Sequence, residues 1–91
     1  MDEFIEMLKD ELKQTGRSLE VSVQELRQYV AERAAHLAQG IGQPGYQDMV
    51  RIERDNVVLA AGLKSVEEAD AADQRIIGII QAALGFLAAA A

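Results

Sequence analysis

The stretch IIGIIQAALGFLAAAA, from Ile76 to Ala91, most constrains the fold, because its sixteen residues carry no charge and Gln81 is their single polar side chain. The stretch is rich in helix-forming alanine and leucine. A helix that is apolar on all sides must be buried on all sides. The beginning of the chain offers it only a narrow apolar stripe, at Phe4, Ile5, Leu8 and Leu12. We therefore expect a further surface to cover the rest of this helix.

One strong break divides the chain into two arms. The stretch Gly40–Gly45 contains three glycines and a proline, which interrupt a helix. Elsewhere alanine, leucine, glutamate and glutamine dominate, as is typical of helical proteins. The sequence therefore predicts an all-α fold in one domain, residues 1–91, with a loop at 40–45. The arms 1–39 and 46–91 are expected to form an antiparallel helical hairpin.

The first arm is expected to contain one helix or two. Thr15 and Gly16 are a plausible stop after the first apolar stripe. The stretch from Ser22 to Glu25 has the S-x-x-E form of a capping box, which predicts a new helix start. Leu26, Val30 and Leu37 would form the buried stripe of that second helix.

The second arm follows a heptad frame, which predicts one long coiled-coil-like helix over 46–91. The twelve frame positions are Met49, Ile52, Asn56, Leu59, Leu63, Val66, Asp70, Asp73, Ile77, Ile80, Leu84 and Leu87, and nine of them are apolar. A competing interpretation breaks the helix, since Gly62 precedes a second S-x-x-E box that starts at Ser65. The frame continues across Ser65 without a skip, so the continuous helix is favoured.

Three frame positions are polar, namely Asn56, Asp70 and Asp73. Buried carboxylates are costly unless they are paired or hydrated. We therefore expect the hairpin to splay, or the face to be wet, near the two aspartates. In antiparallel register about the loop, Arg33 falls nearer Ile52 and Glu53 than Asp70, so a pairing of Arg33 with the aspartates is not expected.

Two stripes run along the uncharged helix. Ile77, Ile80, Leu84 and Leu87 form a large-residue stripe, and small residues at 78, 82, 85 and 89 form the other. Small residues at this spacing let helix backbones approach closely. The sequence predicts a homo-oligomer, with an interface at Ile77, Gly78, Ile80, Leu84, Gly85 and Leu87.

Two other environments could bury this helix, and the sequence leaves both as alternatives. The first is a different partner protein. The second is a bilayer, which would make the chain a small membrane-active protein that inserts this helix. Spanning a bilayer takes about 20 apolar residues, which is more than the sixteen present here. The membrane interpretation is therefore the alternative to self-assembly.

Charge and motif content exclude several function classes. Fifteen acidic residues against nine basic ones argue against nucleic-acid binding, which needs clustered Lys and Arg. The sequence has no cysteine, no glycine-rich phosphate loop and no recognisable catalytic triad. We expect a non-enzymatic protein without a cofactor or metal. A metal or small-ligand site at Glu32 and His36, with Glu53 as a third ligand, is a lesser alternative.

The stretches ERDNVVLAAGLKSVEEADAADQR and AERAAHLAQGIGQPGYQ resemble small uncharacterised helical proteins encoded by tailed bacteriophages. This resemblance covers much of the chain and implies a virion component or a short accessory protein that inhibits host machinery. It carries no functional residue over to this sequence. The acidic start, MDEFIEMLKDE, does not fit a signal peptide, so the expected location is the cytoplasm or a virion.

Overall fold

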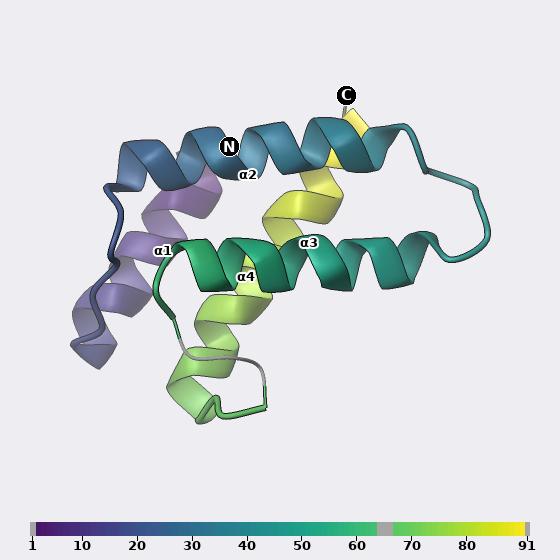
Figure 1. Ribbon diagram of the computed structural model, residues 1–91. Coiled ribbons are helices and arrows are strands. Elements are labelled where there is room, and N and C mark those ends of the chain that lie inside the picture. The colour runs from purple at the N-terminus through teal and green to yellow at the C-terminus, as the bar shows by residue number, and fades with distance from the viewer. Residues whose placement is uncertain (1, 64–66, 91) are drawn as a thin grey trace.

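The computed structural model describes residues 2–63 and 67–90 of the chain. Within these ranges it contains the helices α1 (Asp2–Thr15), α2 (Val23–Ala38), α3 (Tyr46–Ala60) and α4 (Ala71–Ala90), and no strand (Figure 1). The predicted all-α fold class is therefore confirmed.

Of the two interpretations left open for the first arm, the structure has the one with two helices. α1 ends before Gly16, whose φ of 69° is a left-handed conformation that favours glycine. α2 begins after Ser22, whose side-chain oxygen accepts a hydrogen bond from the Glu25 backbone N–H at 3.1 Å. This is the capping bond that the S-x-x-E pattern predicts. The loop between α2 and α3 includes Gly42 and Gly45, both with positive φ.

The single long helix predicted over 46–91 is wrong, because the chain turns at Gly62. The Gly62 N–H donates to the Leu59 carbonyl, and the Leu63 N–H donates to the Val58 carbonyl, both at 3.1 Å. This bonding pattern, with Gly62 at a φ of 75°, is a Schellman motif that ends a helix. The helix boundary proposed at Ser65 lies outside the described residues.

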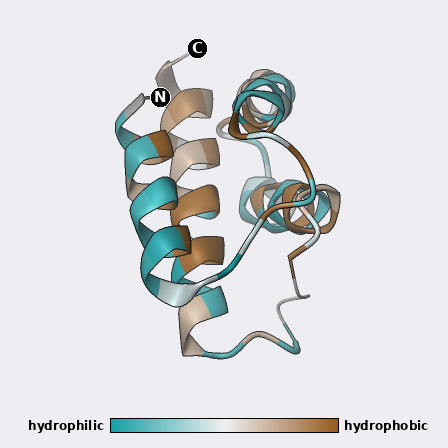
Figure 2. Cartoon of the chain, turned by 90° about the vertical axis from the view of Figure 1, so that its left-hand side faces the viewer, coloured by the Kyte–Doolittle hydropathy of each residue, from teal (hydrophilic) through white to brown (hydrophobic). Residues whose placement is uncertain are grey.

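The four helices form two layers instead of the predicted two-armed hairpin. α2 and α3 lie side by side and run in opposite directions, joined by the loop (Figure 1). α1 and α4 form the other layer, and Figure 2 shows this pair from the side while α2 and α3 are seen end-on. α4 contacts each of the other three helices, which makes it the central element of the fold.

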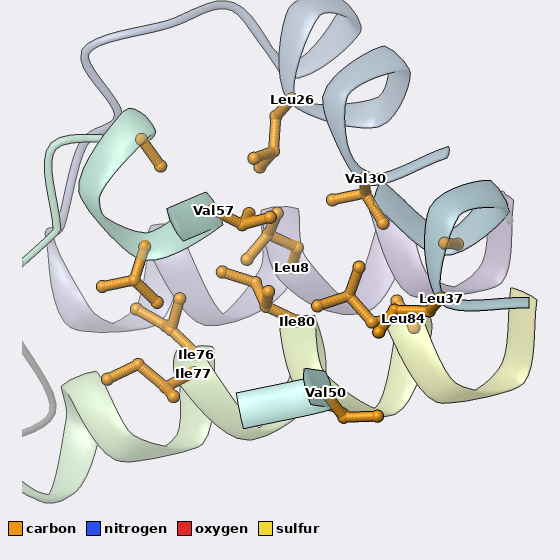
Figure 3. Close-up of a cluster of buried hydrophobic side chains, with 14 of the residues drawn as sticks. Leu8, Leu26, Val30, Leu37, Val50, Val57, Ile76, Ile77, Ile80 and Leu84 are labelled. Atoms are coloured by element: carbon orange, nitrogen blue, oxygen red, sulfur yellow. The ribbon is translucent and has the colours of Figure 1, made fainter. Parts of the chain in front are cut away.

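The core lies between the two layers, and every helix contributes to it (Figure 3). The largest fully buried side chains are Leu26, Leu37, Val57, Ile76 and Leu84. α1 adds Leu8. Burial of such apolar side chains contributes roughly 1.5–3 kcal/mol each to folding before entropy is counted.

The heptad frame describes α4 but not α3. In α4 the frame positions Ile77, Ile80 and Leu84 are buried. In α3 the frame positions Ile52 and Leu59 are 59% and 78% exposed, while Val50, Glu53, Val57 and Val58 are buried instead. Because the chain turns between the helices, α3 and α4 meet different neighbours, and one frame cannot serve both.

Candidate interaction surface on α4

The large-residue stripe of α4 faces the interior of the chain itself. Ile77, Ile80 and Leu84 are each at most 5% exposed, and Leu87 is half-buried. The structure therefore places three of the six predicted interface residues in the core. A second copy could reach them only if the fold opened.

The opposite side of α4 lies at the surface and is made of small residues. Gly78, Ala82 and Ala89 are exposed, and Gly85 is half-buried. We call these four residues the small-residue face. A Cβ atom added at Gly78 or Gly85 would meet no atom within 4 Å, apart from its immediate chain neighbours and the backbone of α4 itself. The two glycines are therefore not required by packing within the chain, which leaves a flat strip where a helix from outside can approach closely.

An open groove of about 570 Å³ lies beside the small-residue face. The α2/α3 pair extends past α4 on the side away from α1 (Figure 1). Its loop contributes Ile41 to the lining of the groove. Ile41 of the loop and Tyr46, Gln47 and Val50 of α3 form one wall. The α4 wall consists of the small-residue face and Gln81. The lining contains no charged side chain.

Two exposed apolar side chains lie on opposite sides of α4, Ile41 in the lining of the groove and Phe86 against α1. Ile41 is 47% exposed at the loop end of the groove. Phe86 is 58% exposed and packs against Phe4 of α1, with the ring centroids 5.5 Å apart. Neither residue belongs to the two stripes read from the sequence. The position of Phe86 on the exposed side of α4 could have been predicted, because it follows Ala82 by four residues in the same helix. The position of Ile41 could not, because it lies in a loop without helical spacing.

The two aspartates near the start of α4 are paired. Asp70 caps the helix, because its side chain accepts a hydrogen bond from the Asp73 backbone N–H at 2.8 Å. Arg17, from the segment between α1 and α2, forms ion pairs with both carboxylates, at 3.0 Å from Nε to Asp73 Oδ1. Because this cation compensates its charge, Asp73 lies buried at 3% exposure. The splayed or wet hairpin that was expected near the two aspartates is therefore not what accommodates Asp73.

The same contacts shift the titration of Asp70. The hydrogen bond from the Asp73 backbone N–H is the main cause that holds the pKa of Asp70 below its usual range. Desolvation opposes this effect, and the charge of Arg17 adds to it. The carboxylate that caps α4 is therefore stabilised in its ionised form.

The residues proposed as a metal site do not converge. Glu32 and His36 are exposed on α2. Glu53 is buried on α3, where its Oε2 lies 3.5 Å from Nη1 of Arg33. This ion pair agrees with the register expected about the loop. Within residues 2–63 and 67–90, no group of three or more His, Asp or Glu side chains is placed to hold a metal ion.

α4 also has the length and composition of a membrane-spanning helix, and within the described part of the chain it alone does. The core helix of a soluble protein meets the same criteria, so this property does not separate the two cases. The chain was compared with protein-family models, with curated proteins and with solved structures, and no match was found.

Proposed function

We propose that this chain is a non-enzymatic interaction protein that self-assembles through the small-residue face of α4. One observation carries the proposal. The described helix is uncharged from Ile76 to Ala90, yet the chain covers only its inward side. The outward side is apolar and borders an uncharged groove. Covering such a surface stabilises an assembly by roughly 25 cal/mol for each Å² of apolar area removed from water.

Charge explains why contact would form here and not elsewhere. The chain has a formal net charge of -6, so two copies repel each other over most of their surfaces. The exposed sides of α1 and α3 carry many of the charges, including Glu6, Lys9 and Asp10 on α1 and Asp48 and Asp55 on α3. The small-residue face carries none. It is the surface where two copies can approach with the least repulsion and the least desolvation of charge.

The resemblance to small phage proteins supports a role as an accessory protein or virion component, in the cytoplasm or within a virion. In such a role the small-residue face would join copies of the chain, and the charged surfaces of α1 and α3 would point outward. A different partner protein that presents an uncharged helix would use the same face.

Light scattering on a sizing column, without and then with mild detergent, tests self-assembly. We expect a discrete multimer without detergent. Gly85→Leu should reduce the multimer to monomer, because the added side chain fills the surface that a second helix approaches. Its control is Ala35→Leu, at an exposed position of α2, which should leave the multimer intact. A wild-type chain that is monomeric at all concentrations would contradict the proposal.

A second candidate is a membrane-active protein that inserts α4, because this helix is long and apolar enough to cross a bilayer, as is also true of some core helices of soluble proteins. Insertion would require α4 to leave the core, because 39% of its apolar window is buried against the rest of the chain. It would expose Leu26 and Val57 to water. In the same experiment this candidate predicts heterogeneous aggregates that resolve only in detergent, and flotation of the chain with lipid vesicles.

A further inference from the structure

The groove beside α4 lies where a further helix could pack in the α1/α4 layer. α1 and α4 fill two places in their layer, and a third place lies on the far side of α4 from α1, where the α2/α3 pair extends past α4 (Figure 1). The floor of the groove is the small-residue face, where backbones can approach closely. The opposite wall, which we call the overhang, includes Ile41, Tyr46 and Val50. An uncharged helix with a small-residue side fits this place.

Within the described residues, the helix that has such a side is α4 itself. The exposed sides of α1, α2 and α3 carry charges that an uncharged groove would leave without partners, at a cost in desolvation. α4 has no charge from Ile76 to Ala90. Because the floor of the groove is also α4, a second α4 that enters presents the same residues that it meets. The contact is therefore self-complementary, as a two-fold dimer requires.

The overhang decides the direction of the second helix. If both copies had their α2/α3 pairs on the same face of the α1/α4 layer, the two loop ends would compete for one space. A two-fold axis along α4 places the second α2/α3 pair on the opposite face. It also makes the two α4 helices parallel, and each loop end then covers the α4 of the other copy.

Resting on the proposed function, we infer that the assembly unit is a two-fold dimer in which each copy inserts α4 into the groove of the other, with the two α4 helices parallel. Each α4 then lies between its own α2/α3 pair and the loop end of the second copy. This arrangement covers the small-residue face and brings Ile41 of each copy into an apolar contact.

Single-cysteine crosslinking measures the direction of the helices, and the chain suits it because it contains no native cysteine. Ala82→Cys and Ala89→Cys lie about 10 Å apart along α4. With a short bis-maleimide reagent, both variants should form covalent dimers, because parallel helices place each position opposite its own copy. Ala35→Cys on the exposed side of α2 should not.

The outcomes separate this inference from self-assembly in general. A covalent dimer from one of the two α4 variants alone would indicate antiparallel helices and overturn the parallel arrangement. A multimer in light scattering without crosslinking at either position would exclude parallel α4 helices in contact and overturn it too. In both cases self-assembly would stand. A monomer in light scattering would overturn the proposed function itself.

A matched pair of exposed isoleucines tests the overhang. Ile41 lines the groove at 47% exposure, whereas Ile52 lies outside it on α3 at 59% exposure. Ile41→Ser should weaken dimerisation about tenfold or more, because each dimer buries two such side chains. Ile52→Ser should leave the dissociation constant unchanged. Equal effects of the two substitutions, measured by sedimentation, would overturn the role of the loop end.

Discussion

From Ile76 to Ala90 the two sides of α4 differ in side-chain size and not in charge. The inward side carries Ile76, Ile80 and Leu84, which are at most 2% exposed between the two layers. The outward side carries Gly78 and Ala82, which are exposed, and adding a Cβ to Gly78 would touch nothing. Large side chains fill the space against helices of the same chain, and small ones leave a strip for close approach from outside. Size therefore distinguishes the two sides where charge does not.

The inward side should respond most strongly to substitution. Leu84 is fully buried, so Leu84→Ala removes apolar contacts and leaves a cavity between the layers. We expect the free energy of unfolding to fall by about 2–5 kcal/mol. Urea denaturation followed by circular dichroism measures this change. A loss below about 1 kcal/mol would mean that Leu84 is not packed in the core.

Phe86 is a large side chain on the outward side of α4, so it tests whether that side is a free surface. It is more than half exposed and contacts Phe4 at 5.5 Å between centroids. Phe86→Ala should cost about 1 kcal/mol, mainly through the lost ring contact. Phe4→Ala is the control for that contact, and the double variant should cost less than the sum of the two. If Phe86→Ala cost as much as Leu84→Ala, the outward side would not be a free surface.

A substitution in the small-residue face should raise the free energy of unfolding, whereas the two substitutions above lower it. Gly78→Ala adds a methyl group into open space within a helix, so we expect the isolated chain to become more stable by about 0.8 kcal/mol. Thermal unfolding at low protein concentration measures this gain. At high concentration the same substitution should reduce association, because the face can no longer be approached as closely. A loss of stability at low concentration would show that Gly78 is packed within the chain.

The smallest effect is expected at the beginning of α4, and it depends on pH. The pKa of Asp70 is lowered in the folded chain, so its contribution to stability is present above the unfolded pKa and disappears as the pH falls below about 4. Asp70→Asn should therefore make the loss of stability at low pH shallower than in the parent chain. Asp55→Asn is the control, at an exposed carboxylate on α3. Identical pH profiles for the two variants would contradict the role of Asp70.

Local sequence signals predicted most helix boundaries correctly, and the exception is informative. Ser22 caps α2, and Gly16 marks the end of α1, as their patterns indicate. Gly62 also carried a local signal, but the continuous heptad spacing outweighed it in the prediction. The spacing was coincidental, since Ile52 and Leu59 of α3 point to solvent. A periodic pattern indicates a shared face only where the helix is unbroken.

The candidate surface was only partly accessible from the sequence. The spacing of Gly78, Ala82, Gly85 and Ala89 identified the small-residue face because it is local to one helix. The groove was not predictable, since its other wall comes from Ile41 and the first turns of α3. The ion pair of Arg17 with Asp70 joins residues 53 positions apart, and one-dimensional spacing carries no information about such a contact.

The central place of α4 has a consequence for synthesis on the ribosome. α4 is the last of the described helices to be made, and it contacts all three that precede it. Until it emerges, Leu8, Leu26 and Val57 have no inward side of α4 to pack against. At about 5–20 residues per second, the 20 residues of α4 take roughly one to four seconds to add. During that time the nascent chain exposes apolar surface, and it is then that chaperones would meet it.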